Sequence, residues 1–144
     1  MAIYFYVPTD EHGYLSNFSR YGFAIDGVYW PTVEHYFQAQ KAAGTEDEER
    51  IRRAYTPKDA KRFGREVRLR SDWEEIKDSV MRRAIQAKFA AHDELAERLV
   101  GTGDEALIEA APGDFYWGAG GDGSGQNRLG KILMEVRADL RAGL

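Results

Sequence analysis

The chain of 144 residues contains no cysteine, which excludes disulfide bonds and thiolate metal sites. Its three histidines, His12, His35 and His92, are far apart in the sequence, and no H-x-x-x-H or similar ligand pair is present. A structural zinc site is therefore not expected. The sequence also has no long apolar run and no signal peptide, so we expect a cytoplasmic protein that does not enter a membrane.

The net charge of the chain is small, but basic residues are concentrated in one segment. The net charge of −4 argues against a protein that coats nucleic acid, yet residues 50–70 hold nine basic and two acidic side chains, a local charge of +7. Such a segment either faces phosphates or is a solvated helix face. The basic residues are Arg50, Arg52, Arg53, Lys58, Lys61, Arg62, Arg65, Arg68 and Arg70.

The patterning predicts one α+β domain over residues 1–144, a small antiparallel sheet packed against several helices. Asp26-Gly27 between two short apolar runs is a strong hairpin signal. Cap residues and apolar periodicity predict helices over about 32–43, 45–55, 56–64, 71–91, 93–100 and from Asn127 onwards. Capping boxes are expected at Thr45 and Ser71, and Asp93 and Asn127 are expected to cap their helices. Strands are expected at 3–6, 23–25, 28–30 and 106–111.

The stretch 113–134 holds seven of the 15 glycines, begins with three consecutive aromatic residues, and ends in an amphipathic helix. Glycine loses much backbone entropy on folding, so this density indicates either a loop that approaches a ligand or a flexible surface loop. Gly118, Gly120 and Gly123 match G-x-G-x-x-G, but no second strand follows, which excludes a dinucleotide fold. Gly125–Lys131 is no phosphate loop either, because Ile132 replaces the required Ser or Thr.

A second informative stretch is W-P-T-V-E-H-Y-F-Q-A-Q-K at residues 30–41. Glu34, Gln38 and Lys41 are spaced i, i+4, i+7, and they therefore share one face of the predicted helix. This face is either an exposed, salt-bridged stripe or a carboxylate and an amine presented into a cleft. Spacing alone favours the exposed, salt-bridged stripe.

Five motifs occur in an order that resembles the NADAR family of YbiA-like N-glycosidases. They are Y-L-S-N-F (14–18), W-P-T-V-E-H-Y-F-Q-A-Q-K (30–41), D-W (72–73), V-M-R-R-A (80–84) and D-x-x-W-G-x-G-x-x-G-x-G-x-N-x-L-G (114–130). The resemblance extends from about residue 3 to the C-terminus. It implies a hydrolase that cuts the bond between a ribose carbon and an amine without a metal or organic cofactor.

The resemblance implies two classes of substrate. One is the phosphoribosylamino-pyrimidine and related intermediates of riboflavin synthesis. The other is ADP-ribose on the amino group of guanine in nucleic acid, where the enzyme would reverse the action of a DarT-type toxin. The partner is therefore a small ribosyl metabolite or ADP-ribosylated nucleic acid, and no membrane is involved.

Carried over by motif, the catalytic residues are Glu34, Lys41 and Asp114. Cleavage of a ribosyl C–N bond builds positive charge at the anomeric carbon, so Glu34 is expected to act as base or electrostatic stabiliser. Asp114 would hold ribose hydroxyls or assist proton transfer. Lys41 would bind phosphate or tune Glu34, or attack the ring-opened sugar as a Schiff base.

The substrate-binding residues implied by the same motifs are Asn17, Trp73, Trp117, Gly118, Gly120, Gly123 and Asn127. The two tryptophans are expected to stack on a base, and the glycine loop to cradle phosphate through backbone N–H groups. The helix and the loop are expected to meet in one cleft. The alternative is a non-catalytic module that binds ADP-ribose or a nucleotide, which would not need Glu34 and Lys41 on a shared helix face.

Overall fold

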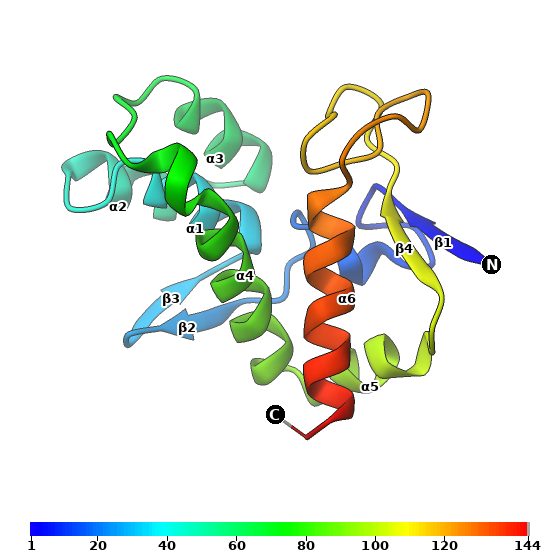
Figure 1. The fold of residues 1–144 in the computed structure, drawn as a ribbon. Coiled ribbons are helices and arrows are strands. Elements are labelled where there is room, and N and C mark those ends of the chain that lie inside the picture. The colour runs from blue at the N-terminus through cyan, green and yellow to red at the C-terminus, as the bar shows by residue number, and fades with distance from the viewer. Residues whose placement is uncertain (144) are drawn as a thin grey trace. The chain divides into compact units, whose positions relative to one another are not determined.

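The computed structural model describes residues 1–143, which form two compact units (Figure 1). Unit 1 contains Met1–Ser19 and the chain from His92 onwards, and unit 2 contains Arg20–Ala91. Helices and short strands occur in both, which confirms the predicted α+β class. The extent of a single domain over residues 1–144 stays a prediction.

Unit 2 begins with the predicted hairpin of β2 (Phe23–Ile25) and β3 (Val28–Trp30), whose strands pair antiparallel. Asp26 and Gly27 both have positive φ, 52° and 78°, as a two-residue hairpin turn of this type requires. The turn is held to α4 (Trp73–Ala91) because the Arg83 guanidinium donates to both carboxylate oxygens of Asp26 at 3.0 Å.

Helix α1 (Val33–Gln40) is the centre of unit 2, where it packs against α2 (Glu46–Arg52), α3 (Pro57–Gly64) and α4. Seven of its eight residues are buried, so its polar face does not lie in solvent. Edge-to-face packing of Trp30 on Tyr36, with ring centroids 5.1 Å apart, joins the hairpin to α1. Among the alternatives for the Glu34 face, the burial excludes an exposed stripe.

The start of α1 is fixed by a hydrogen-bond pair between Thr32 and His35. The Thr32 hydroxyl accepts from the backbone N–H of His35 at 3.1 Å, and its oxygen lies 2.8 Å from His35 Nδ1. His35 Nε2 lies 2.9 Å from the carbonyl oxygen of Ala54. A carbonyl only accepts, so Nε2 carries the proton, and Nδ1 accepts from the Thr32 hydroxyl. This buried histidine is a structural group rather than a ligand.

Burial lowers the pKa of His35 below its ordinary value of 6.5, and the Arg20 charge adds to this effect while the hydrogen bond to Ala54 opposes it. Below pH 6.5 the unfolded chain therefore binds a proton that the folded chain does not. We expect the free energy of unfolding to fall as the pH drops below 6.5 towards the folded pKa. Urea unfolding between pH 8 and pH 5 measures this, and the loss should shrink in His35→Gln. An NMR titration of the His35 ring with a midpoint above 6.5 would contradict it.

The helix boundaries agree with the prediction within a few residues, but three of the caps differ. The Thr45 hydroxyl donates to the Ala42 carbonyl at 2.7 Å instead of capping α2, while Glu48 accepts from the backbone N–H of Gly44 at 3.0 Å. At α5 (Asp93–Gly101) the N-cap residue is His92, not Asp93. Asn127 stands at the N-cap of α6 (Arg128–Arg141), but its side chain makes no capping bond.

In unit 1, β1 (Ala2–Phe5) pairs with β4 (Ala106–Glu109), and the pairing is parallel rather than antiparallel. The expected single antiparallel sheet is thus correct only for β2 and β3. The physical reason is the connection: β1 and β4 are about 100 residues apart in the chain, and parallel strands need such a long crossover. Helix α6 covers β4, as Figure 1 shows.

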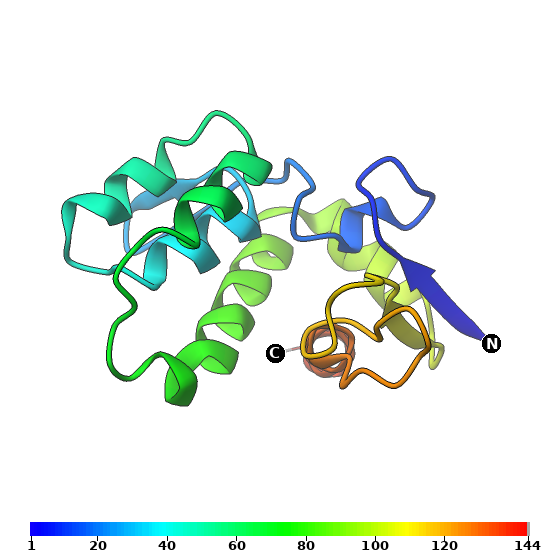
Figure 2. The ribbon, with the colours of Figure 1, turned by 90° about the horizontal axis from the view of Figure 1, so that it is seen from above.

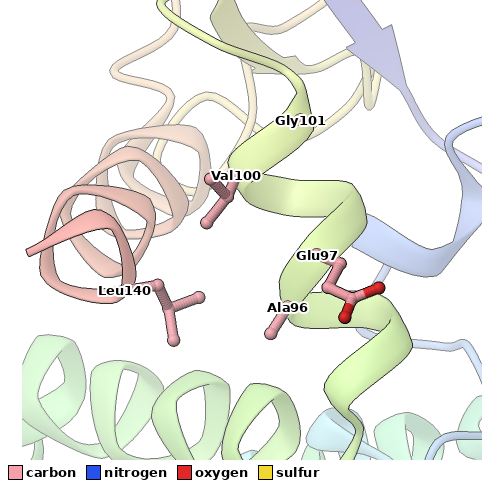
Figure 3. Close-up of a pocket in the computed structure, with 5 residues that line it drawn as sticks. All are labelled: Ala96, Glu97, Val100, Gly101 and Leu140. Atoms are coloured by element: carbon pink, nitrogen blue, oxygen red, sulfur yellow. The ribbon is translucent and has the colours of Figure 1, made fainter. Parts of the chain in front are cut away.

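The loop between β4 and α6 folds over the N-terminal end of α6, as both views show (Figure 2). The buried face of α6 is Leu129, Ile132, Leu133 and Val136, as predicted. Leu140, expected in the same face, is only half-buried. It borders an open, largely apolar hollow of about 420 Å³ between α5 and α6 (Figure 3), which contains none of the predicted site residues.

No helix within residues 1–143 combines the length and the apolar character needed to cross a membrane.

Candidate functional site

The carboxylate of Glu34 is buried, with 6 % of the residue exposed, on the first turn of α1. Gln38, one turn later, donates from Nε2 to Glu34 Oε2 at 2.6 Å. A carboxylate is costly to bury, so its burial on the polar face of α1 makes Glu34 a candidate for a chemical role. The short hydrogen bond fixes the direction of the carboxylate.

Lys41 follows the last residue of α1 and is half-buried. Burial lowers its pKa below the ordinary value, while the Glu34 charge raises it and the charges of Arg65 and Lys61 lower it. Its Nζ lies 5.9 Å from the centroid of the Phe37 ring. Lys41 is therefore electrostatically linked to Glu34 and partly desolvated, which is the arrangement expected of an amine that faces a cleft.

Gln38 is a residue that the sequence prediction did not include among the site residues. Its Oε1 has no hydrogen-bond partner among residues 1–143, and a Cβ on Gly64 would overlap this atom. The last residue of α3 thus presses directly on the side chain that orients Glu34. The i, i+4 spacing to Glu34 was a usable signal, whereas nothing in the sequence indicated Gly64.

Trp73, on the first turn of α4, is 4 % exposed and packs on Phe37 with ring centroids 5.1 Å apart. Phe37 in turn lies under Lys41. A platform for a stacked base needs an accessible face, and Trp73 offers very little. The structure therefore makes it part of the core beneath the Lys41 side of α1, which corrects its predicted stacking role.

Asp114 organises the start of the loop in unit 1. Its Oδ1 accepts from the backbone N–H groups of Tyr116, at 3.0 Å, and Trp117, at 2.8 Å, which closes a local turn. Trp117 is half-buried and meets the Tyr116 ring edge-on at 4.8 Å. One carboxylate oxygen is thus committed to the backbone, and Trp117 retains an accessible part.

The glycines of the loop serve its own packing. A Cβ on Gly118 would lie 2.9 Å from the Asp114 carbonyl oxygen, and one on Gly120, where φ is 70°, would overlap the Phe115 ring. The N–H of Gly120 donates to the Asp114 carbonyl at 3.1 Å, and that of Gly123 donates to Gly120 at 3.4 Å. These two donors are not available to a phosphate, so the predicted backbone cradle is wrong for Gly120 and Gly123.

Asn127, in the left-handed conformation with φ 51°, ties the loop to β4. Its Oδ1 accepts from the N–H of Glu109 at 3.0 Å, and its Nδ2 donates to the carbonyl of Leu107 at 2.9 Å. Both side-chain groups therefore serve the fold rather than a substrate. Asn17, just after the 3-10 turn η1 (Gly13–Leu15), is half-buried in the same unit.

The predicted residues thus fall into two groups, one in each unit. Unit 2 gathers Glu34, Lys41 and Trp73 around α1, and unit 1 contains Asn17 together with the loop of Asp114 and Trp117. Among the described residues, no group of three or more His, Cys, Asp or Glu side chains is arranged to hold a metal ion.

More than half of the basic residues at 50–70 are neutralised within unit 2. Arg50 pairs with Glu66 at 3.0 Å, and Arg52 and Arg53 both pair with Glu49. Arg62 and Arg70 pair with the nearby Asp59 and Asp72. Asp59 and Glu66 are already counted in the local charge of +7, and Glu49 and Asp72, which lie outside residues 50–70, offset two further charges.

Comparison with known proteins assigns the chain to a family. The NADAR domain model matches residues 4–141, so the chain belongs to the NADAR domain family, as its motifs predicted. It is 47 % identical over 140 residues to the N-glycosidase YbiA of Escherichia coli (strain K12), covering 96 % of this chain and 88 % of that protein. The NMR structure of E. coli YbiA superposes with a TM-score of 0.91 at 46 % identity, over 99 % of this chain and 86 % of that one.

A longer relative shares the same region. The chain is 43 % identical over 141 residues to the riboflavin biosynthesis protein VVA0006 of Vibrio vulnificus (strain YJ016). This alignment covers 96 % of the present chain but 38 % of that protein.

Proposed function

We propose that the protein, an N-glycosidase of the NADAR family, hydrolyses the bond between C1 of a phosphorylated ribose and an amine nitrogen. The observation that carries the proposal is the buried Glu34 carboxylate, held by Gln38 at 2.6 Å and electrostatically linked to Lys41. As the C–N bond breaks, positive charge develops at C1, and a fixed carboxylate in a site of low dielectric stabilises that charge.

Lys41 is proposed to act on the same substrate from the other end of α1. A lowered pKa raises the share of neutral amine, which suits attack on the open-chain sugar aldehyde as a Schiff base. The simpler role is electrostatic: the Lys41 ammonium binds phosphate or tunes Glu34. We favour the simpler role, because Glu34 and the substrate phosphate both stabilise the charged form.

Asp114 and Trp117, in the loop of unit 1, stay proposed substrate residues. Asp114 has one carboxylate oxygen engaged by two backbone N–H groups, so its other oxygen would hold a ribose hydroxyl. Trp117 supplies a ring against which a base can pack. Asn17 stays a proposed substrate contact.

For the substrate we propose a ribosylamino-pyrimidine phosphate. The support is the Vibrio vulnificus relative, whose name places it in riboflavin biosynthesis and which matches 96 % of this chain at 43 % identity. No cofactor is needed for such a hydrolysis.

A second candidate is ADP-ribose on the guanine amino group of nucleic acid, formed by a DarT-type toxin. It is favoured by Lys58 and Arg68, exposed cations with no ion pair among the described residues, together with Tyr55, which is 87 % exposed. Exposed cations interleaved with an aromatic ring suit a nucleic-acid strand.

Parallel hydrolysis assays distinguish the two candidates. One reaction contains a ribosylamino-pyrimidine phosphate, and the other an oligonucleotide carrying ADP-ribose on guanine. We expect release of ribose 5-phosphate from the first, with kcat/KM at least about tenfold above that for the oligonucleotide, a difference of about 1.4 kcal/mol in transition-state binding. Preferential release of ADP-ribose would support the second candidate, and no release from either would refute the proposed function.

A further inference from the structure

The C-terminal end of α3 lies against the polar face of α1, next to the proposed catalytic carboxylate. Gly64 is the point of contact, since it approaches Gln38 so closely that a Cβ would overlap the amide. Lys61 and Arg65 stand three residues before and one residue after Gly64, and both are exposed. The close approach of the two helices therefore brings these two cations to the Gln38–Lys41 end of α1.

Within the described part of the chain, Arg65 and Lys41 are not paired with acidic side chains as most of the basic residues at 50–70 are. The Arg65 side chain makes no ion pair or hydrogen bond among residues 1–143, and neither does the ammonium of Lys41. Lys61 and Arg65 repel the charge of Lys41, and Glu34 attracts it. Cations gathered beside a single buried carboxylate repel one another unless an anion joins them.

We propose that Lys61 and Arg65, together with Lys41, form the subsite for the phosphate on O5′ of the substrate ribose. That this phosphate belongs to the substrate rests on the proposed function. Lys41 lies seven residues after Glu34, about 10 Å along the helix axis, so a ribose with C1 at Glu34 can direct its phosphate towards Lys41. Arg binds phosphate through a planar fork of donors and Lys through a point charge, and the subsite offers both.

An alternative explanation is that Lys61 and Arg65 only stabilise the C-terminus of α3, where cations complement the helix dipole. That explanation predicts a small loss of stability on their removal and no change in phosphate binding. The two explanations therefore differ in a binding measurement.

The first test is calorimetric titration of the intact protein with ribose 5-phosphate, with ribose, and with ADP-ribose. We expect the wild type to bind ribose 5-phosphate more tightly than ribose. Arg65→Gln and Lys61→Gln should each weaken ribose 5-phosphate binding by about tenfold and leave ribose binding unchanged. Arg62→Gln, the same change of charge at an exposed position of the same helix where the side chain is paired with Asp59, is the matched control and should bind as the wild type does. A parallel loss of ADP-ribose binding would place its diphosphate in the same subsite.

The second test is kinetic, with the phosphorylated ribosylamine and its dephosphorylated counterpart. Arg65→Gln should raise KM for the phosphorylated substrate about tenfold with kcat within about twofold, and leave the dephosphorylated one unaffected. If the variants bind and turn over like Arg62→Gln, the subsite is refuted while the hydrolase assignment stands. If the wild type hydrolyses nothing but binds ribose 5-phosphate through Arg65, the subsite stands and the proposed reaction fails.

Discussion

Glu34→Gln is expected to lower kcat for ribosyl–amine hydrolysis by about 10²–10⁴-fold, with KM changed by less than about threefold. The substitution removes the charge that stabilises the developing positive charge at C1, but it keeps the size of the side chain. In the wild type Gln38 donates to Glu34 Oε2 at 2.6 Å, and the amide oxygen of the substituted side chain can accept the same hydrogen bond. The measurement is steady-state kinetics with the ribosylamine substrate, beside a calorimetric Kd for ribose 5-phosphate.

The same variant separates a catalytic carboxylate from a structural one. Burial of a charge opposes folding, so Glu34→Gln is expected to unfold at the same or a higher temperature than the wild type. Glu46→Gln, the same change at an exposed position on the first turn of α2, is the control and should leave kcat unchanged. If Glu34→Gln lost binding together with turnover, or kept turnover, the carboxylate would not be the group that acts on C1, and the alternative of a ligand-binding module would gain support.

The helices and the hairpin could be predicted because their signals are local. Asp26-Gly27 specifies a turn with two positive φ angles, and Thr56 before Pro57 specifies the start of α3, where its hydroxyl accepts from the N–H of Asp59 at 3.0 Å. The parallel pairing of β1 with β4 was not predictable in this way. It joins residues about 100 positions apart, and neither strand has a sequence pattern that indicates which strand it pairs with.

The residues that carry the chemistry of the candidate site could be predicted from the sequence, but the helices that bury them could not. The i, i+4, i+7 spacing placed Glu34, Gln38 and Lys41 on one face of α1, whereas burial of that face depends on α3 and α4. The loop was the harder case. Its glycine content suggested a ligand cradle, while the structure uses the N–H groups and the space around Gly120 to close the loop on itself. A high density of glycines indicates that the backbone needs space or positive φ angles there. It does not show whether a ligand or the packing of the loop itself is the reason.

Gly130 is another glycine that is required by the space around it, and here the loss of stability on replacement can be measured. It lies in the first turn of α6, where a Cβ would overlap the Leu107 carbonyl oxygen and the Asn127 amide group. The overlap would push α6 away from β4 and strain the two hydrogen bonds by which Asn127 holds that strand. We expect Gly130→Ala to lower the free energy of unfolding by about 2–4 kcal/mol, since neither partner can move freely.

The direction of the change in the free energy of unfolding is informative, because the higher helix propensity of alanine would by itself raise it. An alanine in place of a helical glycine stabilises by about 1 kcal/mol where space allows. Gly101, the last residue of α5, meets nothing within 4 Å of a Cβ and is the matched control. Urea unfolding of both variants with a common m-value should therefore shift the midpoint down for Gly130→Ala and leave it level or raise it for Gly101→Ala. A Gly130→Ala protein as stable as the wild type would mean that α6 does not depend on this close approach to β4, and that the glycine that ends the motif at 114–130 serves something other than packing.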